Sequence, residues 1–366
     1  MSGLLKLVCI AVLAILAAGG AHAMEANSKE ADAGAGPIKM RMTKCLIANK
    51  SHEGTPCPEP QLSLNGSPAE QVASRLARAW YFIDMQNLKQ ARAEADAAVE
   101  INPKDAKVRH LSARISLALA DMPRAEADLE LARKEAPADP DIHATYAKLL
   151  QYRPADTESL REFLEIIQKY PSHLYARQEA AQLCVKFNQF PLALANFTYL
   201  IEHKPDADLF ARRAEVYLAL GQPQLAATDY SSALVLNPQT YVLLVARANA
   251  YALAEQNELA VRDLDSLLEI TDGKPSFALG NADRAKLLAM RARSLVNLRR
   301  LKDASNDMME ALSIGGNTAI LRAQVFLRRH GFPEIPINGK DASALREAIT
   351  SCFSLNACFQ GIIQSI

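Results

Sequence analysis

The chain has 366 residues, of which 49% are apolar, and its 41 Lys and Arg residues balance 41 Asp and Glu residues. Such an apolar fraction is typical of a folded protein. A net charge of zero gives no support for nucleic-acid binding or for an acidic substrate, since both are usually met by a basic surface.

The N-terminus has the pattern of an export signal. Lys6 precedes an apolar run over residues 7–18, and the small-residue sequence Ala-His-Ala follows at 21–23 as a cleavage site. The run is too short to span a bilayer, which needs about 20 residues. We therefore expect residues 1–23 to be a signal peptide. The mature chain, without a transmembrane helix, would be periplasmic in a bacterium or secreted otherwise; a retained amphipathic anchor is the alternative.

Two close cysteine pairs remain in the mature chain, one near each end. In an exported protein such pairs suggest local disulfides. Cys45 and Cys57 lie in segment 24–70, which is expected to be flexible apart from the loop that they staple. His52 could join them as a third metal ligand, but a structural zinc site needs four ligands, so a disulfide is the preferred interpretation.

The second pair, Cys352 and Cys358, carries a geometric condition. Six residues of continuous helix rise about 9 Å, whereas a disulfide tolerates less than about 7 Å between Cα atoms. If these cysteines are joined, the helix must break at residues 354–356. The remaining Cys184 takes an apolar place in the repeats described next and is expected to be a buried thiol.

Small residues recur along the chain at a period of about 34. The first set consists of Ala79, Ala113, Ala147, Ala181, Ala214, Ala248 and Ala292. Twelve residues after each of these lies a second small residue, namely Ala91, Ala125, Ser159, Ala193, Ala226, Ala260 or Ala304. Small side chains let two helices cross closely. Each repeat is therefore predicted to be a helical hairpin that must stack on its neighbours to bury its apolar face.

Helix boundaries are also marked. The sequence Ser67-Pro68-Ala69-Glu70 is typical of a helix start and opens the first hairpin. Prolines, which cannot continue a helix, punctuate the period at Pro103, Pro137, Pro171, Pro205 and Pro238. The third copy places Pro154 between its helices, and an insertion at residues 275–284 precedes the seventh.

The hairpins resemble the tetratricopeptide repeat (TPR) over about two thirds of the chain. The fifth copy carries the family's preferred residues at Ala214, Tyr217, Gly221, Ala226, Tyr230, Ala233 and Pro238. The resemblance implies an all-α fold, a right-handed solenoid of about seven hairpins over residues 71–317. A small helical module at residues 318–366 would follow it.

The TPR resemblance also implies a concave groove lined by the first helix of each hairpin. The residues expected to face it are Trp80, His110, Arg114, Lys148, Tyr152, Gln182, Lys186, Glu215, Asn249 and Arg293. An exposed tryptophan beside basic residues suits a peptide groove. His110, Arg114 and Lys148 would favour an acidic or C-terminal carboxylate ligand. The alternative is that these are ordinary solvated helix faces and that Trp80 packs against the leader.

Residues 318–366 follow another pattern. Gln324, Gly331-Phe332, Asn338-Gly339 and Ala348 have the spacing of a small three-helix peptidoglycan-binding module. The resemblance implies peptidoglycan as a second partner, although Asn338 replaces the usual Asp. The alternative is a helical cap that shields the last repeat, as solenoid ends require.

The sequence contains no P-loop, nucleophile elbow, HExxH or CxxC motif. We therefore predict no catalytic residue, no cofactor and no metal site. The expected function is that of an exported, non-enzymatic scaffold that binds a protein or peptide in its groove and is held near the cell wall by its C-terminal module. Two alternatives are a structural component that assembles through the solenoid ends and an accessory subunit of an envelope enzyme.

Overall fold

The computed structural model describes residues 59–238, 240–272, 281–340, 343–355 and 358–363. These residues form seventeen α-helices and no strand, which confirms the predicted all-α class. Contacts divide the chain into two units, residues 1–192 and 193–366, with the boundary inside helix α10 (Phe190–His203). Among the described helices, none is both long enough and apolar enough to cross a membrane.

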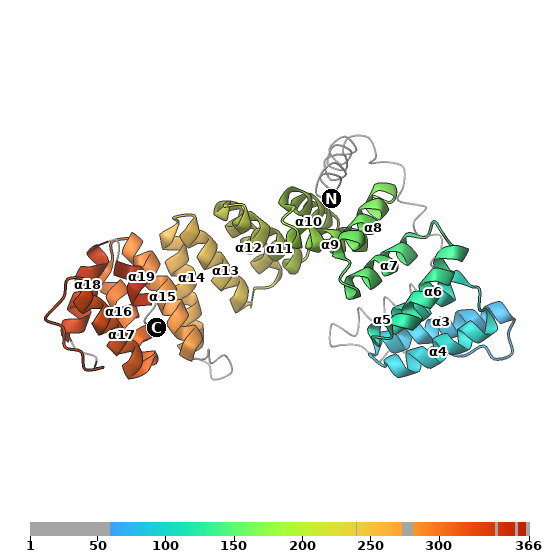
Figure 1. Ribbon diagram of the computed structural model, residues 1–366, viewed down its shortest axis with the longest axis horizontal. Helices are drawn as coiled ribbons and strands as arrows, with labels where there is room; N and C mark the ends of the chain where they lie inside the picture. Colours follow the sequence, from blue (N-terminus) through green and yellow to red (C-terminus); the bar gives the residue numbers. More distant parts are fainter. Residues whose placement is uncertain (1–58, 239, 273–280, 341–342, 356–357, 364–366) are drawn as a thin grey trace. The chain divides into compact units, whose positions relative to one another are not determined.

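The first unit is a stack of helical hairpins (Figure 1). Its helices are α3 (Pro68–Asp84), α4 (Leu88–Ile101), α5 (Ala106–Ala118), α6 (Met122–Glu135), α7 (Pro140–Tyr152), α8 (Asp156–Lys169), α9 (Leu174–Lys186) and the start of α10. Helices α3, α5 and α7 each pack against the helix that follows. The first helices also contact one another, α3 with α5 and α5 with α7, so they share one face of the stack.

The second unit continues the pattern and ends in three further helices. Its helices after α10 are α11 (Ala207–Ala219), α12 (Pro223–Leu236), α13 (Tyr241–Leu253), α14 (Asn257–Asp272), α15 (Asn281–Asn297), α16 (Leu301–Ile314), α17 (Gly316–Arg329), α18 (Ser343–Ser354) and α19 (Cys358–Ile363). Of the insertion predicted at residues 275–284, residues 275–280 lie outside the described residues, and residues 281–284 form the first turn of α15.

The predicted small positions are all helix crossings. All seven recurring alanines, and all seven small residues twelve places later, are fully buried. Ser159 shows why a hydroxyl is tolerated there, because its Oγ donates to the carbonyl of Ala147 across the crossing at 2.7 Å. The repeat register is therefore confirmed at every copy.

The predicted helix boundaries are confirmed as well. Ser67 caps α3 by accepting from the Glu70 amide, while the Glu70 carboxylate accepts from the Ser67 amide at 2.7 Å. Each of the five punctuating prolines comes two residues after a helix end, as Pro103 follows Ile101. The turn inside six of the hairpins places one residue in the left-handed region; these residues are Gln86, Ala120, Asn188, Gly221, Glu255 and Arg299. Only Gly221 adopts that conformation without steric cost.

The C-terminal helices share a core with the seventh hairpin. Met308 and Leu312 of α16 belong to the same buried cluster as Leu327 of α17 and Phe353 of α18. Helix α19 lies against α17 so closely that a Cβ on Gly361 would fall 2.0 Å from the Phe326 ring. The three helices thus pack on the last repeat.

Candidate functional site

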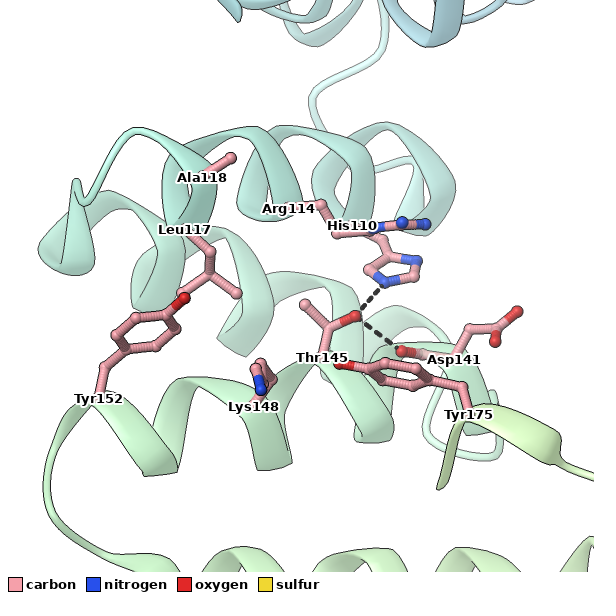
Figure 2. A pocket seen from close by; sticks show the side chains of 9 residues that line it. All are labelled: His110, Arg114, Leu117, Ala118, Asp141, Thr145, Lys148, Tyr152 and Tyr175. Carbon is pink, nitrogen blue, oxygen red and sulfur yellow. Dashed lines mark hydrogen bonds between the residues drawn. The ribbon is translucent and has the colours of Figure 1, made fainter. Parts of the chain in front are cut away.

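One pocket gathers four of the predicted groove residues in the first unit. It has a volume of about 470 Å³ and is lined by α5, α7 and α9. Figure 2 shows His110, Arg114, Leu117 and Ala118 reaching it from α5, Asp141, Thr145, Lys148 and Tyr152 from α7, and Tyr175 from α9. Residues four or seven apart share a face of a helix, which is why each helix supplies a continuous stripe.

His110 is held in one tautomer by a chain of hydrogen bonds. The Thr145 hydroxyl donates its proton to the Asp141 carbonyl at 2.9 Å, so it must accept from His110 Nε2, which lies 2.7 Å away (Figure 2). A neutral imidazole protonated at Nε2 leaves Nδ1 as an acceptor. Burial, aided by the charge of Arg114, lowers the pKa of His110 to about 4, so the ring is neutral at physiological pH.

Arg114 is a cation stacked on an aromatic ring. Its guanidinium carbon lies 4.5 Å from the centroid of the Trp80 ring, which belongs to α3 and is half-buried. No carboxylate among the described residues forms an ion pair with Arg114 within 4.0 Å, although Asp141 lines the same pocket. Trp80 therefore supports the pocket from behind Arg114 and does not line it.

Lys148, by contrast, is neutralised. Its Nζ donates to Glu179 at 2.9 Å and to Gln151 at 3.0 Å, and Gln151 donates to the same Glu179 oxygen at 3.2 Å. Glu179 is buried on α9. Of the three residues expected to form a basic run, only Arg114 retains a charge without an ion-pair partner among the described residues.

The rest of the pocket combines one carboxylate with aromatic and apolar surface. A hydrogen bond from His173 Nε2 at 3.2 Å lowers the pKa of Asp141, which is therefore ionised. Tyr152 and Tyr175 are 53% and 43% exposed. Burial raises the pKa of Tyr175 to about 12, so its hydroxyl remains a hydrogen-bond donor. Leu117 adds apolar surface.

The other predicted groove residues are not part of this pocket. Gln182 is half-buried on α9, and Lys186, near the end of that helix, forms an ion pair with Asp156. In the second unit Glu215, Asn249 and Arg293 are exposed, and no hydrogen bond joins them among the described residues. Sequence reasoning missed Asp141, Thr145, Tyr175 and Glu179. Asp141 lies seven residues before Lys148, a spacing that could have placed it on the same helix face.

Only one of the two predicted cysteine pairs lies within the described residues. Cys45 and Cys57 lie outside the described residues. Cys352 and Cys358 lie at disulfide distance, with Cα atoms 5.4 Å apart, and the helix breaks between α18 and α19 as the geometric condition required. Cys184 is buried. No group of three His, Cys, Asp or Glu side chains in the described part of the chain is placed to hold a metal ion.

In residues 318–366, the side chains that resemble the peptidoglycan-binding module hold a turn of the backbone in place. Gln324 is fully buried, and its Oε1 accepts from the amides of Asn338 and Gly339, both at 3.0 Å. Its Nε2 donates to Asn338 Oδ1 at 3.2 Å and to the Lys340 carbonyl at 3.0 Å. These side chains thus hold the turn between α17 and α18.

Comparison with known proteins agrees with this architecture. No protein-family model matches the chain, and no curated protein matches it. Among solved structures, the C-terminal part of a TPR repeat-containing protein from Cytophaga hutchinsonii superposes with a TM-score of 0.51 at 17% identity, covering 64% of this chain and 93% of that one.

Two further structures are less similar. Pseudomonas aeruginosa PilF has a TM-score of 0.49 at 15% identity, covering 57% of this chain and 95% of its own. PilW, described as a type IV pilus biogenesis factor, has a TM-score of 0.48 at 18% identity. The match covers 56% of this chain and 95% of PilW. The superposition on the Cytophaga hutchinsonii structure, together with the buried repeat register, shows a TPR-type α-solenoid fold.

Proposed function

We propose that the chain is an exported, non-catalytic scaffold that binds a protein or peptide partner in the pocket formed by α5, α7 and α9. The observation that carries the proposal is the set of polar groups left unused there. Arg114 has no ion-pair partner among the described residues, and two exposed tyrosines flank an apolar surface. Aromatic side chains and arginine dominate the energetics of protein interfaces.

Export is supported by two independent features. The first is the signal-peptide pattern of residues 1–23. The second is the proximity of Cys352 and Cys358, because disulfides persist in oxidising compartments. Thiol trapping of the protein in intact cells tests this part of the proposal. A single buried reduced thiol, Cys184, is expected, whereas five reduced thiols in the mature chain would contradict export.

Binding in the pocket is tested by site-specific photocrosslinking in the cell. A photoreactive amino acid replaces Tyr175, which lines the pocket, or the equally exposed Tyr241 at the start of α13. We expect a discrete protein adduct from position 175 and none of that mass from position 241. The adduct should disappear when Arg114→Ala is added to the Tyr175 variant. Identical adducts from both positions, or an adduct indifferent to Arg114, would refute the pocket as the binding site.

We propose further that residues 318–366 hold the scaffold near the cell wall. The support is the Gln324 clamp, which joins the residues of the peptidoglycan-binding pattern around one turn. Co-sedimentation of the full chain with insoluble peptidoglycan tests it. Binding that is lost in Gln324→Ala while helicity is retained is expected, and absence of co-sedimentation by the unaltered chain would remove the proposal.

A further inference from the structure

The polar end of the pocket presents both hydrogen-bond donors and acceptors. The donor is the guanidinium of Arg114. One acceptor is Nδ1 of His110. The other ring nitrogen, Nε2, donates to Thr145, whereas Nδ1 has no hydrogen-bond partner among the described residues. The second is the Asp141 carboxylate, which receives one hydrogen bond from His173 at Oδ1 and whose side chain is 75% exposed.

The charges at this end are balanced but separated. Arg114 and Asp141 line the same pocket without a direct ion pair, since no contact of 4.0 Å or less joins their charged atoms. Lys148 and the buried Glu179 cancel each other at the next turns of α7 and α9. A ligand carboxylate that approached Arg114 would therefore also meet the negative charge of Asp141. Among the described residues that line the pocket, no second Lys or Arg without an ion-pair partner offsets that charge.

A neutral group with one acceptor and two donors fits this arrangement without that repulsion. Resting on the function proposed above, we infer that the pocket recognises a primary carboxamide, the side chain of an Asn or Gln in a partner peptide. The amide oxygen accepts from Arg114, and the amide nitrogen donates to His110 Nδ1 and to Asp141. Leu117 and the ring of Tyr152 then contact the apolar side chain of a neighbouring peptide residue.

A discriminating pocket of this kind should reject the isosteric acid. A carboxylate in place of the amide would oppose the negative charge of Asp141 and would have no proton to donate to His110 Nδ1. Specificity for Gln over Glu, or Asn over Asp, is therefore the measurable signature, and Asp141 is the residue that sets it.

The chain supplies its own probe for the test. Trp80 is the only tryptophan, and it lies beneath Arg114, so a ligand that engages Arg114 should alter its fluorescence. A positional-scanning library of N-acetylated, C-amidated pentapeptides is titrated against the full chain. We expect one position to select Asn or Gln, and the best peptide to bind at least about ten times more tightly than its Asp or Glu isostere.

Two variants sharpen the result. Asp141→Asn should remove the repulsion and bring the acid isostere to within about threefold of the amide. Asp208→Asn is the matched control, because Asp208 occupies the same place in α11 that Asp141 occupies in α7, two residues after an aspartate N-cap. It should leave the tenfold preference unchanged.

The outcomes separate this inference from the proposed function. Selection of Asp or Glu, or equal affinity for amide and acid in the unaltered chain, overturns the carboxamide inference while the Tyr175 adduct still supports a binding pocket. Absence of both peptide selection and the Tyr175 adduct overturns both. An Asn or Gln preference that Asp141→Asn fails to relax overturns the role assigned to Asp141 and, with it, the inference.

Discussion

The hairpins of the second unit and those around the pocket share one backbone register but use their charges differently. In α11 to α16 an arginine precedes each recurring alanine and binds an aspartate sixteen residues later. The pairs are Arg213 with Asp229, Arg247 with Asp263 and Arg291 with Asp307, each joined by two hydrogen bonds of 2.7–2.8 Å. We call these three pairs the arginine ladder.

Each arginine of the ladder also reaches the preceding hairpin. Arg213 donates to Thr198, Arg247 to Ser231 and Arg291 to Asp265, so one guanidinium ties three helices together. The hydrogen bonds to the aspartates raise the pKa of Arg213, Arg247 and Arg291. All three guanidinium nitrogens of each of these arginines donate inside the stack.

Around the pocket the equivalent positions are Ser112 and Tyr146. Ser112 donates to the buried Asp128 at 2.6 Å, and Tyr146 receives Arg133 against its ring at 4.0 Å. Arg109 of α5 also donates to Asp128 at 2.7 Å, but no arginine directly precedes Ala113 or Ala147, and Arg114, one place after Ala113, lines the pocket. The repeat therefore fixes the positions of the helices. The residue before each recurring alanine determines whether a charged side chain joins neighbouring helices or remains available to a ligand.

The largest expected effect comes from breaking one rung of the ladder. Arg247→Ala leaves the buried Asp263 carboxylate without its main partner, and we expect a loss of about 3 kcal/mol in the free energy of unfolding. Arg212→Ala is the control, because Arg212 forms only an exposed pair with Asp208 one turn away. Chemical denaturation followed by helical circular dichroism measures both. Equal losses would show that the ladder contributes nothing beyond a surface pair.

A smaller effect, of opposite sign, is expected in the turns. Ala120 adopts the left-handed conformation that Gly221 adopts at the same place in the fifth hairpin. Ala120→Gly should therefore stabilise the first unit by about 1 kcal/mol, because it relieves a steric cost. Ala93→Gly, at an exposed position inside α4 of the same unit, should destabilise by about the same amount. Thermal melts compare the two, and a loss of stability in Ala120→Gly would contradict the comparison.

Arg114→Ala tests whether the arginine of the pocket serves binding and not helix stacking. Arg114 is exposed above the half-buried Trp80 ring, and a cation–π contact at an exposed site contributes about 0.5–1 kcal/mol. Its loss should therefore alter stability by less than the loss of Arg247. The Trp80 fluorescence spectrum should change, and peptide binding should be abolished. A loss of stability as large as that of Arg247→Ala would make Arg114 a stacking residue instead of a binding one.

The smallest effect concerns protonation. His110 is expected to titrate at about 4 in the folded chain, below its ordinary value, because burial and Arg114 disfavour the imidazolium. The stability that depends on neutral His110 is thus present above about pH 6.5 and is lost as the pH falls toward 4. Nuclear magnetic resonance of the ring protons gives the pKa, and Arg114→Ala should raise it. An unshifted midpoint would contradict the buried, Thr145-bonded ring.

The sequence allowed the fold to be predicted because its main determinants are local and periodic. Ala147 and Pro171 identify a crossing and a helix end by their spacing alone, and both are confirmed. The arginine ladder follows the same period, since Arg213 and Arg247 are 34 residues apart and each precedes its aspartate by sixteen.

The site could be predicted only in part. The register placed His110, Arg114, Lys148 and Tyr152 on the correct face. The charge of the pocket could not be inferred, because it depends on Glu179, which comes 31 residues after Lys148 and meets it only in the folded stack. The same is true of the His110 tautomer, which is set by the Thr145 hydroxyl on a neighbouring helix.

The last helix shows how little secondary structure is needed when its contacts are fixed. Helix α19 has six residues, fewer than a helix requires to persist alone in water. Its first residue lies at bonding distance from Cys352, and its backbone rests at Gly361 on the Phe326 ring. The order of α19 therefore depends on the bond between Cys352 and Cys358 and on a close helix contact that only glycine permits. A thiol-reducing environment would break that bond and leave α19 held by packing alone.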